Sequence, residues 1–394
     1  MRLPILLMII ILLLNGVVDY YLYKIIKLRS NNRFWAKSYA LLSIIIAVAI
    51  VCVICLPRRT GSDDTLYFIM YGLITYFSIY SPKYVFLLFD FIAKIPQLFH
   101  KTRWKYITKV GAFTAIVAFV LMWWGVFNRY NIKEKHVDVE IASLPKSFDG
   151  YKIAQISDLH LGSYNNDTTF VAKLVERLNS LNVDAVAFTG DIVNRNSAEL
   201  QPFVNTLSKI STKDGVFSVL GNHDYGDYAD WESKELKRAN MQLMYDLHKQ
   251  MNWRLLLNEY VTVYRGSDSI AVIGVENLGD PPFKNYGSLE KADSLIDKSI
   301  TKILLSHNPA HWEREIKNNK EKNIALTLSG HTHAMQFELL GLSPAVFRYK
   351  YWGGLYSDSI QQKLYVNAGV GTVAMPMRIG ATPEITIITL RCPK

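Results

Sequence analysis

The sequence predicts two structural parts: a multi-span α-helical membrane region, followed by an α/β domain with a two-sheet β-sandwich core flanked by helices. Three observations predict this division. Long uncharged apolar runs fill the first third of the chain, and short apolar stretches alternate with amphipathic ones after about residue 128. The charge also changes: residues 1–135 hold 17 basic and 5 acidic residues, whereas the remainder holds 27 and 29. We therefore predict a transmembrane region at 1–127, a linker at 128–147 and an α/β domain at 148–394.

Four apolar segments are candidate membrane spans. They are residues 3–23, 38–56, 65–95 and 110–127. Most are close to the roughly 20 residues that a helix needs to cross the hydrocarbon core. The segment 65–95 is longer and is interrupted around Pro82, so it forms either one kinked helix, which we prefer, or two short ones.

The basic residues between the spans predict the topology. Lysines and arginines concentrate in the connection after the first span and in the connection before the last one. Because such loops stay in the cytoplasm, both chain ends are expected outside a cytoplasmic membrane that the chain crosses several times. An odd number of crossings would reverse the side of the C-terminal half.

The second half begins with a β-α-β order. Residues 151–156 and 184–189 are typical of strands, and residues 168–181 have the apolar spacing of a helix. Further strands are expected at 215–220, 255–264, 270–275, 302–306, 324–328, 363–367 and 384–390. So many strands exceed one simple doubly wound sheet and favour two sheets.

Polar side chains follow five of these strands directly. The segments are Ser157-Asp-Leu-His160, Thr189-Gly-Asp191, Leu220-Gly-Asn-His-Asp224, Leu305-Ser-His-Asn308 and Leu328-Ser-Gly-His-Thr-His333. Ligand sites in α/β sheets lie beyond the carboxyl ends of strands, so these groups can converge. Carboxylates, an amide oxygen and imidazoles form a mixed nitrogen and oxygen set, which suits Mn, Fe or Zn.

This ordered set resembles the motifs of the calcineurin-like metallophosphoesterases over about residues 148–392. Within that family the chain is most similar to the bacterial membrane-associated branch, because Pro376-x-Arg378-x-Gly380-x-x-Pro383-Glu384 resembles its C-terminal pattern. One departure is Ala334-Met335-Gln336, where many members of the branch have Gly-Gly-Gln. The added bulk is expected to narrow the pocket.

The resemblance implies a role for each matched residue. A first divalent metal ion would be held by Asp158, His160 and His333, and a second one by Asn222, His307 and His331. Asp191 would bridge both ions. His223 would contact the phosphate and help the leaving oxygen depart, with Asp224 orienting it. No organic cofactor site is predicted.

The implied activity is hydrolysis of a phosphoester or pyrophosphate bond by metal-activated water, which makes the protein a metal-dependent phosphoesterase such as a phosphodiesterase. We expect a lipid-linked substrate, because a catalytic domain tethered after the last span samples the bilayer surface. Aromatic residues in two segments, 225–231 and 347–352, suit a headgroup interface.

Two other functions stay open. A non-catalytic membrane-bound sensor would be expected to lack a ligand, and none is missing from the motifs. A nucleotidase or nuclease would share the metals, but the second half has no basic surplus for a nucleic-acid backbone. We therefore predict the lipid bilayer as a partner, no nucleic acid and no obligate protein partner.

Overall fold

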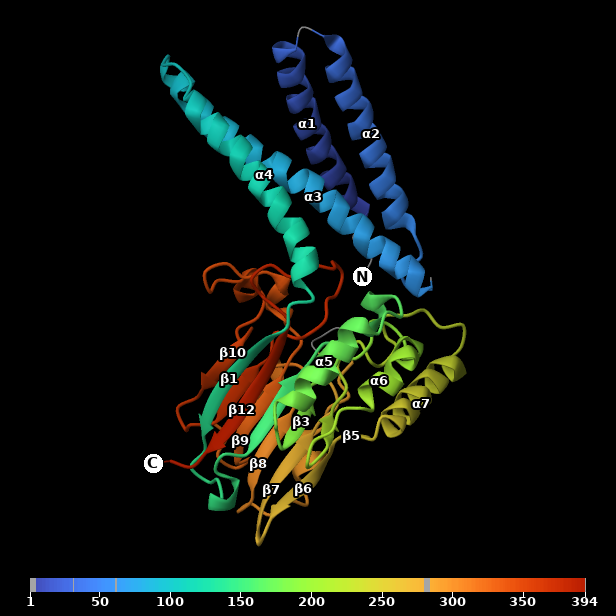
Figure 1. The fold of residues 1–394 in the computed structure, drawn as a ribbon, viewed down its shortest axis with the longest axis vertical. Coiled ribbons are helices and arrows are strands. Elements are labelled where there is room, and N and C mark those ends of the chain that lie inside the picture. Colours follow the sequence, from blue (N-terminus) through green and yellow to red (C-terminus); the bar gives the residue numbers. More distant parts are fainter. Residues whose placement is uncertain (1–4, 31, 61, 280–283, 394) are drawn as a thin grey trace. The chain divides into compact units, whose positions relative to one another are not determined.

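The computed structural model describes residues 5–30, 32–60, 62–279 and 284–393, with side chains from Ile9 onward. It separates into two compact units (Figure 1). The helical unit contains Met1–Pro57 and Phe68–Val126, and the α/β unit contains Arg58–Tyr67 and Phe127–Lys394. Each unit is described by itself.

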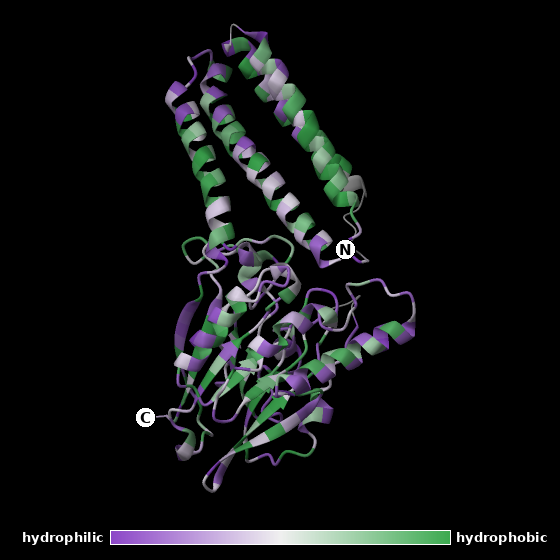
Figure 2. Ribbon diagram, turned by 45° about the vertical axis from the view of Figure 1, so that its right-hand side comes forward, coloured by the Kyte–Doolittle hydropathy of each residue, from purple (hydrophilic) through white to green (hydrophobic). Residues whose placement is uncertain are grey.

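Long helices make up the helical unit. They are α1 (Ile5–Arg29), α2 (Arg33–Cys55), α3 (Asp63–Lys94) and α4 (Lys105–Asn128). In the described part of the chain, α1 from Ile9, α2 and α4 have the length and hydropathy of membrane spans. Hydrophobic residues predominate along these helices (Figure 2). The predicted span at 65–95 lies almost entirely in a single helix, α3, but among the described residues α3 does not reach the hydropathy of a membrane span.

Charged groups inside the helical unit pair with one another. The Asp19 carboxylate accepts from Lys83 Nζ at 2.7 Å, and also from the hydroxyls of Tyr39 at 2.6 Å and Tyr80 at 2.8 Å. Asp90 is buried and forms ion pairs with Lys94 and Arg103. A buried charge is costly unless it is paired, so these contacts join helices that would otherwise expose single charges to lipid.

The α/β unit contains the remaining elements. Its strands are β1 (Lys133–Glu140), β2 (Lys152–Ile156), β3 (Ala185–Phe188), β4 (Val216–Ser218), β5 (Trp253–Leu255), β6 (Glu259–Arg265), β7 (Asp268–Gly274), β8 (Thr301–Leu305), β9 (Ile324–Ser329), β10 (Gly354–Ser357), β11 (Lys363–Val366) and β12 (Glu384–Arg391). Its helices are α5 (Thr169–Ser180), α6 (Val204–Leu207), α7 (Lys234–Gln250) and α8 (Leu289–Asp293).

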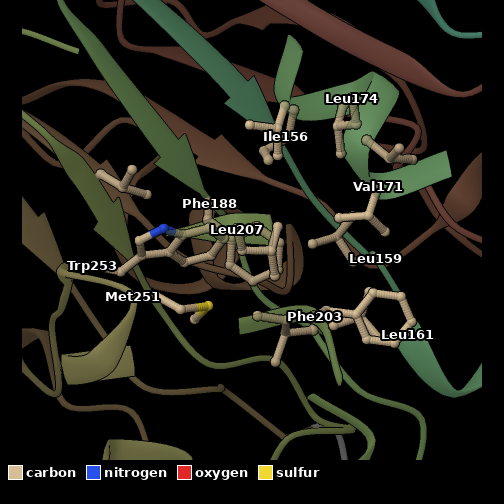
Figure 3. Packing of buried hydrophobic residues seen from close by; sticks show 14 of the residues in the cluster. Ile156, Leu159, Leu161, Val171, Leu174, Phe188, Phe203, Leu207, Met251 and Trp253 are labelled. Atoms are coloured by element: carbon tan, nitrogen blue, oxygen red, sulfur yellow. The ribbon is translucent and has the colours of Figure 1, made fainter. Parts of the chain in front are cut away.

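Two six-stranded sheets form the core, in the orders β1-β12-β2-β3-β4-β5 and β10-β11-β9-β8-β7-β6. Successive side chains of a strand point to opposite faces. In β2, Ile153 therefore packs between the sheets, whereas Ala154 and Ile156 pack toward the helices. Figure 3 shows the helical side of this core, where Phe188 and Trp253 lie near Leu207.

The two-sheet fold predicted from the sequence is confirmed, with local differences. The segment 128–147, expected to be a linker, contains β1, which pairs in parallel with β12 along its full length. The strand expected at 255–264 is divided between β5 and β6. Strand β10, an edge strand, was not expected.

Candidate metal centre

The predicted site residues lie in turns after the central strands of both sheets. Asp158 and His160 follow β2, Asp191 follows β3, Asn222 and His223 follow β4, His307 follows β8, and His331 and His333 follow β9. Five of these residues have positive φ, namely Asp158, His160, Asp191, His331 and His333. Such backbone strain is concentrated at functional sites, where surrounding structure holds it in place.

Two glycines allow these turns to approach one another. A Cβ on Gly330 would overlap the Asp158 carboxylate, and a Cβ on Gly221 would overlap the Asp191 carboxylate. Glycine is therefore required beside each carboxylate for steric reasons, which explains the Gly-His and Gly-Asn sequences.

The first group of ligand-type atoms comes from Asp158, His160 and His333, all of them buried. The Nε2 atoms of His160 and His333 lie 3.0 Å apart, and His333 Nε2 lies 3.3 Å from Asp158 Oδ1. The ligand atoms of this trio lie within 4.8 Å of one another, close enough to surround one ion.

The second group comes from Asp191, His307 and His331. His307 Nε2 lies 3.2 Å from Asp191 Oδ2 and 3.2 Å from His331 Nδ1. Asn222 Oδ1 is also 3.2 Å from His307 Nε2. Because Asp191 Oδ2 is 3.7 Å from His160 Nε2 as well, its carboxylate lies between the two groups.

The donor set fits two divalent cations. Burial lowers the pKa of His160 to about 3, so its imidazole is neutral and keeps a lone pair. Burial would also lower the pKa of His307, but the Asp191 carboxylate raises it to about 9. The centre therefore attracts positive charge at Asp191 and offers an unprotonated nitrogen at His160, which is the combination that a metal ion satisfies.

His223 lies beside the two groups without belonging to either. Its backbone N–H donates to Asp191 Oδ1 at 2.8 Å, and its Nδ1–H donates to the carbonyl of Asn194 at 2.7 Å. The ring stacks on Tyr228 with centroids 4.0 Å apart. These contacts leave Nε2 as the ring nitrogen available to a ligand.

The expected contact between Asp224 and the His223 ring is wrong. The Asp224 carboxylate is buried and instead accepts from the backbone N–H groups of Asp191, Ile192, Val193 and Gly221, at 2.8–3.2 Å. Asp224 thus fixes the turn that carries Asp191, while Asn194 orients His223. A backbone carbonyl carries no residue-type signal, so the sequence could not reveal this partner.

Arg378 is a second supporting residue, which belongs to the C-terminal pattern but had no predicted role at the site. It is fully buried, and its Nη2 donates to His333 Nδ1 at 3.2 Å. Its other donors bind the carbonyls of Ala368, Gly371 and Ala381. Arg378 therefore fixes both the imidazole of His333 and the loop that follows β11.

A cavity of about 310 Å³ opens over the metal-site residues and is also lined by Tyr228, Met335, Gln336 and Tyr349. One tyrosine thus comes from each aromatic segment recognised in the sequence. Ala334 and Met335 both have φ of 48°, a conformation that favours glycine. This backbone conformation explains why many members of the branch have Gly-Gly at these two positions. In this chain, the Met335 side chain forms part of the cavity wall.

The two-sheet fold and the paired metal groups define a metal-dependent phosphoesterase. Family models agree: residues 151–335 match the calcineurin-like phosphoesterase model, and residues 1–129 match the probable calcineurin-like phosphoesterase transmembrane domain. The chain belongs to the calcineurin-like metallophosphoesterases and carries a membrane domain of that family.

Relatives are found in bacteria and animals. An uncharacterized metallophosphoesterase of Campylobacter jejuni is 27% identical over 97% of each chain. A transmembrane protein with metallophosphoesterase domain from Danio rerio is 29% identical over 70% of this chain and 61% of that protein. A solved dimetal phosphatase from Danio rerio has 13% identity and a TM-score of 0.32, covering 56% of this chain and 88% of that one.

Proposed function

We propose that this protein hydrolyses a phosphoester or pyrophosphate bond of a membrane lipid at a two-metal centre. Asp158, His160 and His333 would hold one ion, and Asn222, His307 and His331 the other. Asp191 would bridge them. The observation that carries the proposal is the convergence of the two ligand groups on either side of the Asp191 carboxylate.

Each side chain at the centre has a definite task in this reaction. Two bound cations lower the pKa of a water and stabilise the attacking and leaving oxygens. His223 acts as the general acid, because its Nδ1–H is held by Asn194 and its Nε2 can pass a proton to the leaving oxygen. Asp224 keeps Asp191 in place through its four backbone contacts.

An exposed apolar segment beside the cavity supports a lipid substrate. It continues from Met335, which lines the cavity, to Phe347. Its large apolar side chains face solvent: Leu340 is 94% exposed and Phe347 92% exposed, and Leu339, Leu342 and Val346 are also exposed. Contiguous exposed apolar side chains mark membrane or protein interaction sites. Here they border the active centre of a membrane-anchored enzyme.

We place the active centre on the extracytoplasmic side. The basic connections after α1 and before α4 favour the cytoplasm. Residues Arg58–Tyr67, which include most of the connection after α2 and the start of α3, belong to the α/β unit. Residues Arg58–Tyr67 and the catalytic domain would then lie on one side of the membrane, and both basic connections on the other. A chain that crosses the membrane four times has this arrangement.

A comparison of substrates tests the lipid proposal. The full-length protein in detergent with Mn²⁺ would be given solubilised membrane lipids, soluble nucleotides and a chromogenic diester. We expect lipid turnover to exceed nucleotide turnover. Leu340→Ser combined with Phe347→Ser should lower lipid turnover severalfold and leave the soluble diester unchanged, because only the lipid uses the apolar surface.

Leu295→Ser is the matched control, because Leu295 is 82% exposed but lies outside this segment. Nucleotide turnover equal to or above that of every lipid would reject the lipid substrate and favour the nucleotidase alternative. Absence of any metal-dependent turnover would reject the enzymatic proposal itself.

A further inference from the structure

His223 is held from outside the metal site by two segments. One is the turn at Asn194, whose carbonyl accepts from His223 Nδ1–H. The other is the segment Tyr225–Trp231, whose Tyr228 ring stacks on the imidazole and whose hydroxyl accepts from Asn222 Nδ2 at 3.0 Å. The position of the imidazole therefore depends on how firmly these two segments are fixed.

The first segment is fixed by a buried chain of polar contacts. The Asn194 N–H donates to Glu199 Oε2 at 2.6 Å, and Arg195 Nε donates to Glu199 Oε1 at 3.3 Å. Arg195 extends this series of contacts: its Nη2 donates to Asp63 Oδ1 at 2.5 Å, and its Nη1 donates to the carbonyl of Arg58 at 3.0 Å. Asp63 thus lies at the outer end of the chain that holds Asn194.

The second segment is fixed by Arg59. Its Nε donates to Asp230 Oδ1 at 2.5 Å, and its Nη2 donates to the carbonyls of Asp227 and Ala229, both at 3.1 Å. The Asp230 N–H in turn donates to the Arg59 carbonyl at 3.2 Å. These acceptors flank Tyr228 on both sides in the sequence, so Arg59 clamps the turn that presents the stacking ring.

Arg59 lies in the connection between α2 and α3, and Asp63 is the first residue of α3. Both are far in sequence from everything that they hold. We propose that they are positioning residues for His223: from one ten-residue segment, Arg58–Tyr67, they fix both supports of the imidazole. This inference rests on the proposed role of His223 as the general acid. It assigns a positioning role to the segment Arg58–Tyr67, which the metal-site motifs do not include.

The test must separate positioning of His223 from a general loss of stability. A p-nitrophenyl diester needs no proton on its leaving oxygen, whereas the matching ethyl diester does. We expect Arg59→Ala and Asp63→Asn to lower kcat for the ethyl ester about tenfold, because small displacements of a catalytic group are costly. The p-nitrophenyl ester and the bound metal content should change little.

A double-mutant cycle gives the second readout. If Arg59 acts through His223, Arg59→Ala should have no further effect on ethyl-ester turnover in a His223→Ala protein. Arg59→Lys should recover part of the loss, since a lysine restores the charge but not the forked contacts. All of these measurements are made on the full-length protein in detergent with Mn²⁺.

Neighbouring residues provide matched controls. Asp64 is exposed, and within the described residues its side chain forms no ion pair; Arg58 contributes its carbonyl rather than its guanidinium. Asp64→Asn and Arg58→Ala should therefore behave as wild type. Equal losses on both esters, or full additivity with His223→Ala, would overturn the positioning role alone. A His223→Ala protein with normal ethyl-ester turnover would overturn the general-acid role and this inference with it.

Discussion

Asp191 combines two tasks in one side chain. Its Oδ2 lies between the imidazoles of His160 and His307, and its Oδ1 accepts the backbone N–H of His223. The carboxylate is thereby linked to both ligand groups and to the proposed acid. Loss of this single group should consequently affect more than one function of the site.

We predict that Asp191→Ala abolishes turnover and lowers the bound metal at both positions, because one carboxylate serves two cations. His223→Ala should keep both metals and slow hydrolysis of the ethyl diester by roughly 10²–10⁴, the usual loss for a missing general acid. Elemental analysis beside steady-state kinetics measures both effects. Full activity in the Asp191 variant would be incompatible with the mechanism.

Individual site residues could be predicted from the sequence where the chemistry requires a particular residue type. Carboxylates and imidazoles after strands indicated the ligand set, and the structure brings all seven predicted ligand side chains together. The residues that orient the ligands and His223 could not be predicted in this way. Asn194 acts through its carbonyl, and Arg378 reaches His333 across 45 residues, so neither contact leaves a local pattern.

Among the elements, the segment Phe347–Trp352 depends on Glu313 for its anchorage. Glu313, in the helical turn Trp312–Ile316, accepts from Lys350 at 2.7 Å and from the Tyr351 hydroxyl. Burial would raise its pKa, but hydrogen bonds from Lys350, Tyr351 and Lys317 lower the pKa of Glu313 to about 2. Tyr349 of this segment lines the active-site cavity.

The lowered pKa predicts an acid-sensitive anchorage. A carboxyl whose pKa falls on folding stabilises the folded protein at any pH above its pKa in the unfolded chain, which is near 4.5 for Glu313. This contribution is lost as the pH drops toward 2. Glu313→Gln should therefore reduce the melting temperature at pH 7, and the difference from wild type should disappear as the pH falls toward 2. The effect is small, because the pair is partly exposed. Glu290→Gln, at an exposed position, is the control and should leave the melting temperature at pH 7 unchanged.

Element prediction worked best where burial dictated the pattern. Strands β2, β3, β8 and β12 are buried along almost their whole length and were recognised as apolar runs. Strand β1 lies at a sheet edge with mostly exposed, charged side chains, so its pairing with β12 is a tertiary effect that local propensity does not encode.

For the whole molecule, the proposed topology places the C-terminus outside the cytoplasmic membrane. Protease added to intact spheroplasts should remove a tag fused after Lys394, because the positive-inside rule keeps both basic connections in the cytoplasm. A cytoplasmic reporter protein should stay intact in the same sample. Protection of the tag until lysis would instead indicate an odd number of crossings.

The membership of Arg58–Tyr67 in the α/β unit has a consequence for how the chain can be divided. The chain passes between the two units at three places, after Pro57, after Tyr67 and after Val126. A fragment that begins at Phe127 would therefore lack ten residues of the α/β unit, including Arg59 and Asp63. An intact catalytic unit cannot be obtained by removing the first third of the sequence alone.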